Sequence, residues 1–153
     1  MIALYTQGLD PGALLTSFCQ ERADIGGVVS FTGLARSEAG EVVALELEAY
    51  PGFTEPWIAD LAQVARQRFS LLDLLIVHRI GMIAPGEAIV FVAAAARHRR
   101  QAFEGADFLM DHLKSQAPFW KKQHGQAGAH WIEPRSLDYQ DLQRWTASSS
   151  ETT

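Results

Sequence analysis

The sequence predicts an α+β fold in a single domain, with mostly antiparallel strands and three main helices. Segments with strand or helix character alternate along the chain in the order β-α-β-β-α-β-β-α-β. Turns join several consecutive strand segments, and strands joined in this way pair antiparallel. The chain has 153 residues, of which 48% are hydrophobic, so we expect one core and one domain over residues 1–145. The polar residues 146–153 are expected to form a disordered tail.

Two helices are expected in the first half of the chain. Asp10 and Pro11 begin a helix that extends to about residue 22, because Asp caps helix N-termini and Pro fits the first turn. Thr54 caps the second helix, at about 55–69, whose expected inward residues are Trp57, Ile58, Leu61, Val64 and Ala65. The strands expected in this half cover residues 2–6, 28–32 and 42–50, and a mobile polar loop is expected at 37–41.

The second half begins with two apolar strands, 72–80 and 88–96, which are separated by a turn and long enough to pair as a hairpin. A helix follows over about 99–116, and Pro118 ends it because proline disfavours helical backbone in the residue before it. Its expected inward arc is Ala102, Phe103, Ala106, Leu109, Met110, Leu113 and Ala117. Residues 119–122 are expected to be extended, 125–129 a loop and 130–132 a short strand, and the pattern over 137–145 permits a terminal helix.

Composition and charge exclude several classes of protein. The net charge of −5 argues against general nucleic-acid binding, and the longest apolar run, residues 88–96, is too short to span a membrane. The N-terminus lacks the basic and apolar regions of a signal peptide, so we expect a cytoplasmic protein. The single cysteine, Cys19, cannot form an internal disulfide. It follows Leu14, Leu15 and Phe18 at helical spacing, which predicts a buried structural thiol.

Positive charge is concentrated in residues 97–122. This stretch holds six of the thirteen Lys and Arg residues, including all the lysines, and only three acidic residues. A local positive field on an acidic protein favours a site for an anionic ligand or partner. Lys114 lies at the border of the apolar face of the predicted helix, and Lys121 follows the break at Pro118, so the two lysines could flank one pocket. The alternative is a border lysine that extends to solvent and a solvated basic turn.

Common catalytic motifs are absent. The sequence contains no GxGxxG, GxxxxGK[ST] or GxSxG motif, and the spacing of its cysteine and histidines does not suit zinc, so no metal site is expected. His98 lies beside Arg99 at a strand end, where it is either an active-site or a structural histidine. Arg36 ends a strand next to the polar loop and, taken alone, is a solvated arginine. Glu48 either pairs with an arginine or belongs to the polar face of its strand.

Four segments carry a resemblance to a known family. They are GGVVSFTGLAR at 26–36, LELEAYPGFTE at 45–55, VHRIGMIAPGEAIVFV at 77–92 and HRRQAFEGADFLMDHLKSQAPFWKK at 98–122. In order and spacing they resemble the MoaE family, the large catalytic subunits of molybdopterin synthase. The last segment is long and specific, whereas the first 25 residues and the tail match poorly. The resemblance implies an α/β-hammerhead fold, which agrees with the predicted order of elements.

The resemblance also implies a reaction and an assembly. Members of the family are sulfurtransferases of molybdenum cofactor biosynthesis, which convert cyclic pyranopterin monophosphate (precursor Z) into molybdopterin by forming a dithiolene. The sulfur comes from the C-terminal Gly-Gly thiocarboxylate of a small ubiquitin-like subunit, whose tail enters a pocket of the large subunit. The implied assembly is a heterotetramer, a central homodimer with one small subunit at each end. No cofactor of the enzyme's own is implied, and neither nucleic acid nor membrane is an expected partner.

The matching segments imply roles for individual residues. The catalytic residues are implied to be Lys114 and Lys121. The substrate-binding residues are implied to be Arg36, His98, Arg99 and Arg135, the last of which lies outside the strongly matching segments. The walls of the channel for the partner's tail are implied to be Met110 and Phe119. These residue types suit the reaction, because arginine binds phosphate well and a lysine in a partly apolar pocket can act as an acid or base.

Two other functions remain open from the sequence. One is a non-catalytic adaptor that binds a ubiquitin-like tail through the same channel but does no lysine chemistry. The other is an anion- or RNA-binding module that uses the basic stretch. The net negative charge and the lack of aromatic residues interleaved with the basic ones argue against RNA binding.

Overall fold

A computed structural model describes residues 1–37 and 42–147 of this chain. Most of the loop expected at 37–41, and the tail from residue 148, lie outside the described residues. The described elements are β1 (Ile2–Tyr5), α1 (Pro11–Cys19), β2 (Gly27–Leu34), β3 (Val42–Ala49), α2 (Thr54–Arg68), β4 (Asp73–Arg79), β5 (Gly81–Ile83), β6 (Ala88–Ala96), α3 (Arg99–Ser115), β7 (Phe119–Gly125), β8 (Gly128–Trp131) and α4 (Ser136–Ala147).

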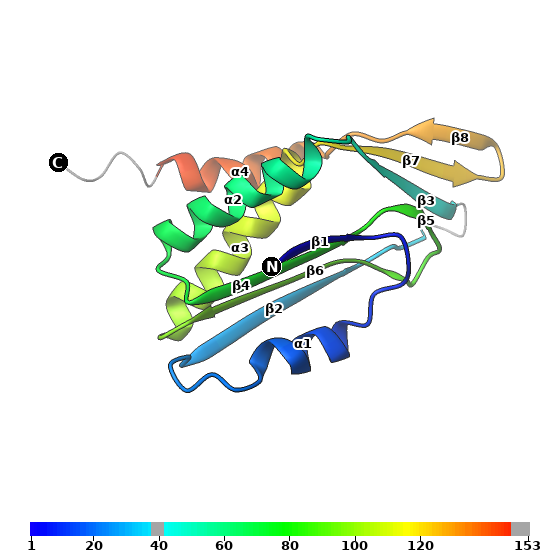
Figure 1. The fold of residues 1–153 in the computed structure, drawn as a ribbon. Coiled ribbons are helices and arrows are strands. Elements are labelled where there is room, and N and C mark those ends of the chain that lie inside the picture. The colour runs from blue at the N-terminus through cyan, green and yellow to red at the C-terminus, as the bar shows by residue number, and fades with distance from the viewer. Residues whose placement is uncertain (38–41, 148–153) are drawn as a thin grey trace.

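The strands form two sheets of four strands each. The first has the order β1-β4-β6-β2 and the second the order β5-β3-β7-β8. All neighbouring strands pair antiparallel except β1 and β4, which are parallel. Helices α2, α3 and α4 lie together over one face of the first sheet, α1 covers the opposite face, and the second sheet extends from one end (Figure 1). The predicted α+β class is therefore confirmed, and the terminal segment forms a full helix.

One predicted strand pair, β4 with β6, is present, and the structure adds two features of β2, β3 and β7 that the sequence analysis did not predict. The two apolar strands β4 and β6 do pair antiparallel, although the short strand β5 lies between them in the sequence. Strands β2 and β3, although consecutive, belong to different sheets. The reason lies in their side chains, because β2 pairs with the fully buried alanines of β6 whereas β3 alternates polar and apolar residues and suits a sheet with one exposed face. The segment after Pro118 is a full strand, β7, that forms a hairpin with β8.

The hydrophobic core has parts on both faces of the first sheet and beside the second. The largest part packs α2 and α3 against the sheet, around residues such as Ile58, Ile76 and Leu109, each of which is fully buried. On the other face α1 packs on Phe91 and its neighbours. A small third cluster, centred on Leu47, joins the second sheet to the end of β2. The third cluster matters for function because the candidate site lies beside it.

Several burial predictions were wrong, and each error has a local cause. Phe103 and Val64, which were expected to face inward, are exposed, whereas Phe108 is buried. Helix α3 packs against α2 and α4 as well as the sheet, so its buried stripe turns toward Phe108 and away from Phe103. Cys19, expected to be a buried thiol, is exposed because α1 ends at this residue, short of residue 22.

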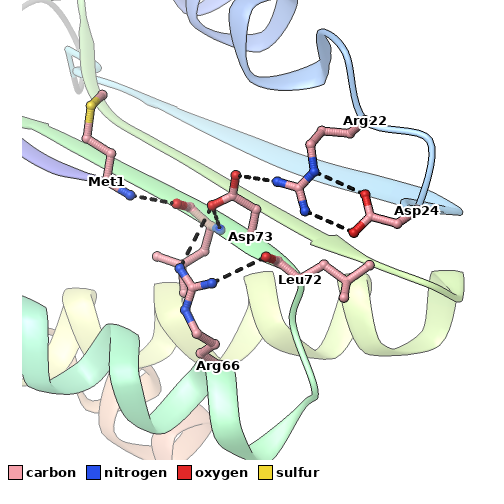
Figure 2. A network of polar contacts seen from close by, with 7 residues as sticks. Met1, Arg22, Asp24, Arg66, Leu72 and Asp73 are labelled. Atoms are coloured by element: carbon pink, nitrogen blue, oxygen red, sulfur yellow. Dashed lines mark hydrogen bonds and ion pairs between the residues drawn. The ribbon is translucent and has the colours of Figure 1, made fainter.

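A polar network ties the start of β4 to helix α2 and to the loop between α1 and β2 (Figure 2). Arg22 binds Asp73 at 3.1 Å and Asp24 at 3.1 Å, and Arg66 of α2 lies 3.8 Å from Asp73 and donates to the carbonyl oxygen of Leu72 at 3.3 Å. These groups are exposed or partly exposed, so solvent screens each pair and its contribution to stability is small. Their main effect is to fix the loops at the end of the molecule opposite the second sheet. Within 1–37 and 42–147, no helix has the length and apolar character needed to cross a membrane.

Candidate active site

A cavity of about 800 Å³ opens where the two sheets, the end of α3 and the start of α4 meet. Five residues that the sequence analysis singled out line it: Lys114, Lys121, Arg36, Arg135 and Met110. They come from the segment after β2, from α3, from β7 and from the residue before α4. The cavity wall also contains apolar side chains of β2 and β3, so the cations lie against a partly apolar surface.

Strand β7 sends its two lysines to opposite faces of the second sheet. Lys121 is paired with Leu47 of β3 and lies on the cavity side, whereas Lys122 is paired with Glu46 and Trp131 on the outer side. The Lys122 amine lies 5.2 Å from the centre of the Trp131 ring, within the range of a cation–π contact. The alternation of side chains in a strand therefore gives adjacent lysines different surroundings.

The outer face of this sheet carries charged side chains and two exposed tryptophans, Trp120 and Trp131. Glu48 is exposed there, opposite Trp120, which decides between the two interpretations of Glu48 in favour of the polar face. Glu46 accepts a hydrogen bond from His124 at 2.7 Å, and this contact holds the pKa of the Glu46 carboxyl below its usual value.

The cavity environment makes Lys121 unusually easy to deprotonate. Burial disfavours its charged form and is the main cause that lowers its pKa from 10.5 to about 8. The positive charge of Lys114 lowers the pKa further, and the negative charge of Asp138 acts in the opposite direction. Lys114 itself lies in the last turn of α3 and is exposed at the cavity edge. The site thus holds one exposed lysine and one lysine that can exchange a proton near neutral pH.

The hydroxyl of Thr54 fixes the place where β7 begins. Its Oγ1 donates to the carbonyl oxygen of Pro118 at 2.7 Å and accepts from the backbone N–H of Tyr50 at 2.8 Å. Thr54 is buried at the start of α2 and does not act as the N-cap, a position that Phe53 occupies. One side chain therefore joins the end of β3, the start of α2 and the residue before β7, which sets the position of Lys121.

A turn before β6 holds the segment that carries Arg36. Ala35 donates to the carbonyl oxygen of Glu87 at 2.9 Å and accepts from the N–H of Gly86 at 2.6 Å. The Glu87 carboxylate in turn accepts from Arg79 at 2.6 Å and from the N–H of Ala84 at 3.0 Å. The residue next to Arg36 is thus bound on both its N–H and its carbonyl, which directs Arg36 to the cavity rim.

The start of α4 brings Arg135 and a buried carboxylate to the same cavity. Asp138 is 8% exposed and accepts from the backbone N–H of Arg135 at 2.9 Å. Its carbonyl oxygen accepts from Ser115 Oγ at 2.9 Å, which joins α4 to the end of α3. The Arg135 side chain is largely exposed, with its Nε 4.0 Å from the Asp138 carboxylate. Asp138 was not found from the sequence, where it resembles any acidic residue in the first turn of a helix.

His78 is a second cavity residue that sequence reasoning did not assign. It is 6% exposed on β4, lines the cavity, and stacks on Phe119 with ring centres 4.2 Å apart. Burial is the main cause that lowers its pKa to about 4, and the charges of Lys121 and Lys114 act in the same direction. The one available signal was its place at the end of an apolar strand within the segment VHRIGMIAPGE.

Three predicted site residues do not line this cavity. Phe119 lies behind His78, in contact with its ring. His98 and Arg99 are exposed at the opposite end of α3, roughly 22 Å from Lys114 along the helix axis. Their role in substrate binding stays a prediction. Among the described residues, no group of three or more His, Cys, Asp and Glu side chains is arranged to hold a metal ion.

Comparisons with known proteins point to one family. A family model described as "MoaE protein" matches residues 4–116. The molybdopterin synthase catalytic subunit of Caulobacter vibrioides is 59% identical over 145 residues, which cover 95% of this chain and 97% of that protein. The solved molybdopterin biosynthesis MoaE protein of Burkholderia ambifaria has a TM-score of 0.81 and 39% identity, over 95% of this chain and 97% of that chain.

A more distant structure has the same fold. It is a complex of subunits 1 and 2 of molybdopterin-converting factor from Helicobacter pylori, which matches with a TM-score of 0.76 and 20% identity over 88% of this chain and 92% of that chain. At this identity the match is evidence for the fold alone. The matches to the family model and to the Caulobacter vibrioides protein, by contrast, cover most of the chain. They confirm the resemblance expected from the four sequence segments, and this chain therefore belongs to the MoaE family.

Proposed function

We propose that this protein is the catalytic subunit of a cytoplasmic molybdopterin synthase. It converts cyclic pyranopterin monophosphate into molybdopterin, with sulfur from the C-terminal thiocarboxylate of a small ubiquitin-like subunit. One observation carries the proposal: Lys114 of α3 and Lys121 of β7 line the same cavity. The 59% identity to a molybdopterin synthase catalytic subunit supports the same activity.

The charges of the cavity match those of the ligands. The substrate carries a phosphate and the partner's tail ends in a thiocarboxylate, so both ligands are anions. Arg36, Arg135 and Lys114 supply positive charge at the rim, and an arginine can bind two phosphate oxygens at once. The apolar wall behind them lowers the local dielectric constant, which strengthens each of these interactions.

Lys121 is suited to move protons during sulfur transfer. With a pKa of about 8, about one tenth of its amines are neutral at pH 7, so the group can both donate and accept protons there. Attack of the thiocarboxylate sulfur on the substrate forms an acyl thioester. Water then hydrolyses its acyl–sulfur bond, which leaves the sulfur on the substrate and releases the tail as a carboxylate. Both steps require proton transfer. Lys114, at the cavity edge, is placed to hold the anionic tail beside the substrate.

The proposed assembly is a homodimer with one small subunit bound to each copy. His98 and Arg99 lie too far from Lys114 to serve the cavity of their own chain, so we propose that they serve the cavity of the second copy. The Caulobacter vibrioides relative, 59% identical, is named as the catalytic subunit of its enzyme, which supports an enzyme of more than one kind of subunit here. Light scattering tests this assembly, and a stable monomer at micromolar concentration, with and without the small subunit, contradicts it.

The activity is tested by mixing this protein with a thiocarboxylated small subunit and the pterin precursor. In a single-turnover molybdopterin assay, Lys121→Ala should lower the rate by about 10²–10⁴-fold, since positioned proton transfer contributes this much. Lys122→Ala is the matched control, with the same charge change on the outer face, and should be far milder. Equal losses in the two variants would mean that general positive charge, and not a placed lysine, is required. Tail binding by the wild-type protein without turnover would indicate the non-catalytic adaptor.

A further inference from the structure

The ring of His78 is a polar group of the cavity to which no task has yet been assigned. It is almost fully buried, yet it lines the cavity at the bottom of the apolar wall. Two contacts fix the ring: it stacks on Phe119 at an interplanar angle of 26°, and its Nδ1 lies 2.9 Å from the carbonyl oxygen of Arg79. The ring therefore cannot turn away from the cavity without losing both contacts.

These contacts also determine which nitrogen carries the proton. A carbonyl oxygen only accepts hydrogen bonds, so Nδ1 must donate and Nε2 must carry a lone pair in the neutral ring. The ring stays neutral at physiological pH, because burial and the positive charges of Lys121 and Lys114 hold its pKa at about 4. Nε2 accepts no hydrogen bond from any residue that the structure describes. Among the described residues, the buried side-chain N and O atoms without a partner are Arg79 Nε and Gln101 Oε1, so Nε2 of His78 is not sealed in the core and lies where a molecule in the cavity can reach it.

We propose that His78 Nε2 accepts a hydrogen bond from an uncharged N–H or O–H group of the ligand bound in this cavity. The lone pair of a neutral ring repels phosphate and thiocarboxylate oxygens, which belong with the cations at the rim. His78 would thus bind the neutral part of a ligand whose charged part is bound by Lys114 and the arginines. The donor is either the pterin ring system of the substrate or a backbone amide of the inserted tail. This inference rests on the proposed function, and it adds a binding residue to it.

Three substitutions of His78 separate this role from its structural roles. In His78→Gln the side-chain carbonyl can take the place of Nε2, so the acceptor is kept. In His78→Asn the amide takes the place of Nδ1, so the bond to Arg79 is kept and the cavity acceptor is lost. In His78→Phe the stack on Phe119 is kept and both nitrogens are lost. Circular dichroism and unfolding by urea show that each variant is folded before its binding and activity are compared.

If Nε2 is an acceptor, the affinity of His78→Gln for the donor ligand should stay within about threefold of the wild-type affinity. His78→Phe and His78→Asn should bind the same ligand about three- to tenfold more weakly. A rise in KM for the precursor assigns the donor to the pterin, and a rise in Kd for the small subunit assigns it to the tail. Wild-type behaviour of His78→Phe, or a loss in His78→Gln as large as in the other two, overturns the proposal. An inactive wild-type protein in the same assay would count instead against the proposed function, and the Kd for the small subunit would still test His78.

Discussion

Replacing Lys121 with Met should make this protein more stable and at the same time inactive. The folded protein holds the Lys121 amine at a pKa of about 8 against an ordinary value of 10.5. Each pKa unit corresponds to about 1.4 kcal/mol, so keeping this amine charged at pH 7 costs the folded state roughly 3 kcal/mol. Methionine keeps the unbranched apolar stem and removes the charge, so Lys121→Met should raise the free energy of unfolding by up to about 3 kcal/mol.

The pH dependence of this gain follows from the sign of the shift. Between about pH 8 and pH 10.5 the unfolded chain keeps the Lys121 proton while the folded protein has lost it. The unfolded state then binds more protons, so wild-type stability rises with pH across this window. The gain in the free energy of unfolding of Lys121→Met over wild type should therefore be largest below pH 8 and disappear by about pH 10.5. Urea unfolding curves at several pH values and one fixed protein concentration measure it.

The adjacent residue provides the control. Lys122→Met makes the same chemical change on the outer face, where the amine contacts Trp131, so it should lower stability by about 0.5–1 kcal/mol. The reasoning is refuted if Lys121→Met is less stable than wild type at pH 7, or if its gain is the same at pH 7 and pH 10.5. Either result would mean that the Lys121 amine is not desolvated in the cavity.

Three further variants test other parts of the site and the fold. Lys114→Arg keeps the positive charge, but arginine does not release a proton near pH 7. If Lys114 exchanges protons, this variant should lose nearly as much single-turnover activity as Lys114→Ala. Glu87→Gln removes the ion pair with Arg79 from the turn that holds Arg36, so it should raise KM for the precursor severalfold with little change in kcat. An unchanged KM would mean that this turn does not position Arg36 for substrate binding. Gly26→Ala should lower the free energy of unfolding by about 2–3 kcal/mol, since the added Cβ would lie 1.9 Å from the carbonyl oxygen of Arg97, and urea midpoints measure this loss.

The parts of the site that depend on local periodicity could be predicted from the sequence. The strand after Pro118 turns Lys121 and Lys122 to opposite faces, as alternation requires. Lys114 lies at the edge of the buried face of α3, as the helical spacing indicated. Both predictions need only the geometry of one element, so no knowledge of its neighbours was required.

The parts that depend on neighbouring elements could not be predicted. Phe108 rather than Phe103 is buried, because α4 packs on α3 and no local pattern revealed that contact. His78 looks in the sequence like an ordinary histidine in an apolar strand, and it faces a cavity only because β7 crosses beside it. The distance of His98 from Lys114 follows from the helix length, but no local pattern in the sequence indicates what lies next to His98 in an assembly.

The hydrogen bond from Thr54 to Pro118 constrains how many residues can lie between Pro118 and Lys121 at the start of β7. Because this bond fixes the residue before the strand, an insertion or deletion of one residue between Pro118 and Lys121 would turn the lysine to the outer face. An insertion of two residues would restore the face but move the amine by about 7 Å along the strand, away from Lys114. We therefore expect related chains to vary in length only beyond β7, in the hairpin turn before β8 at residues 126–127, while keeping an invariant count from Pro118 to Lys121.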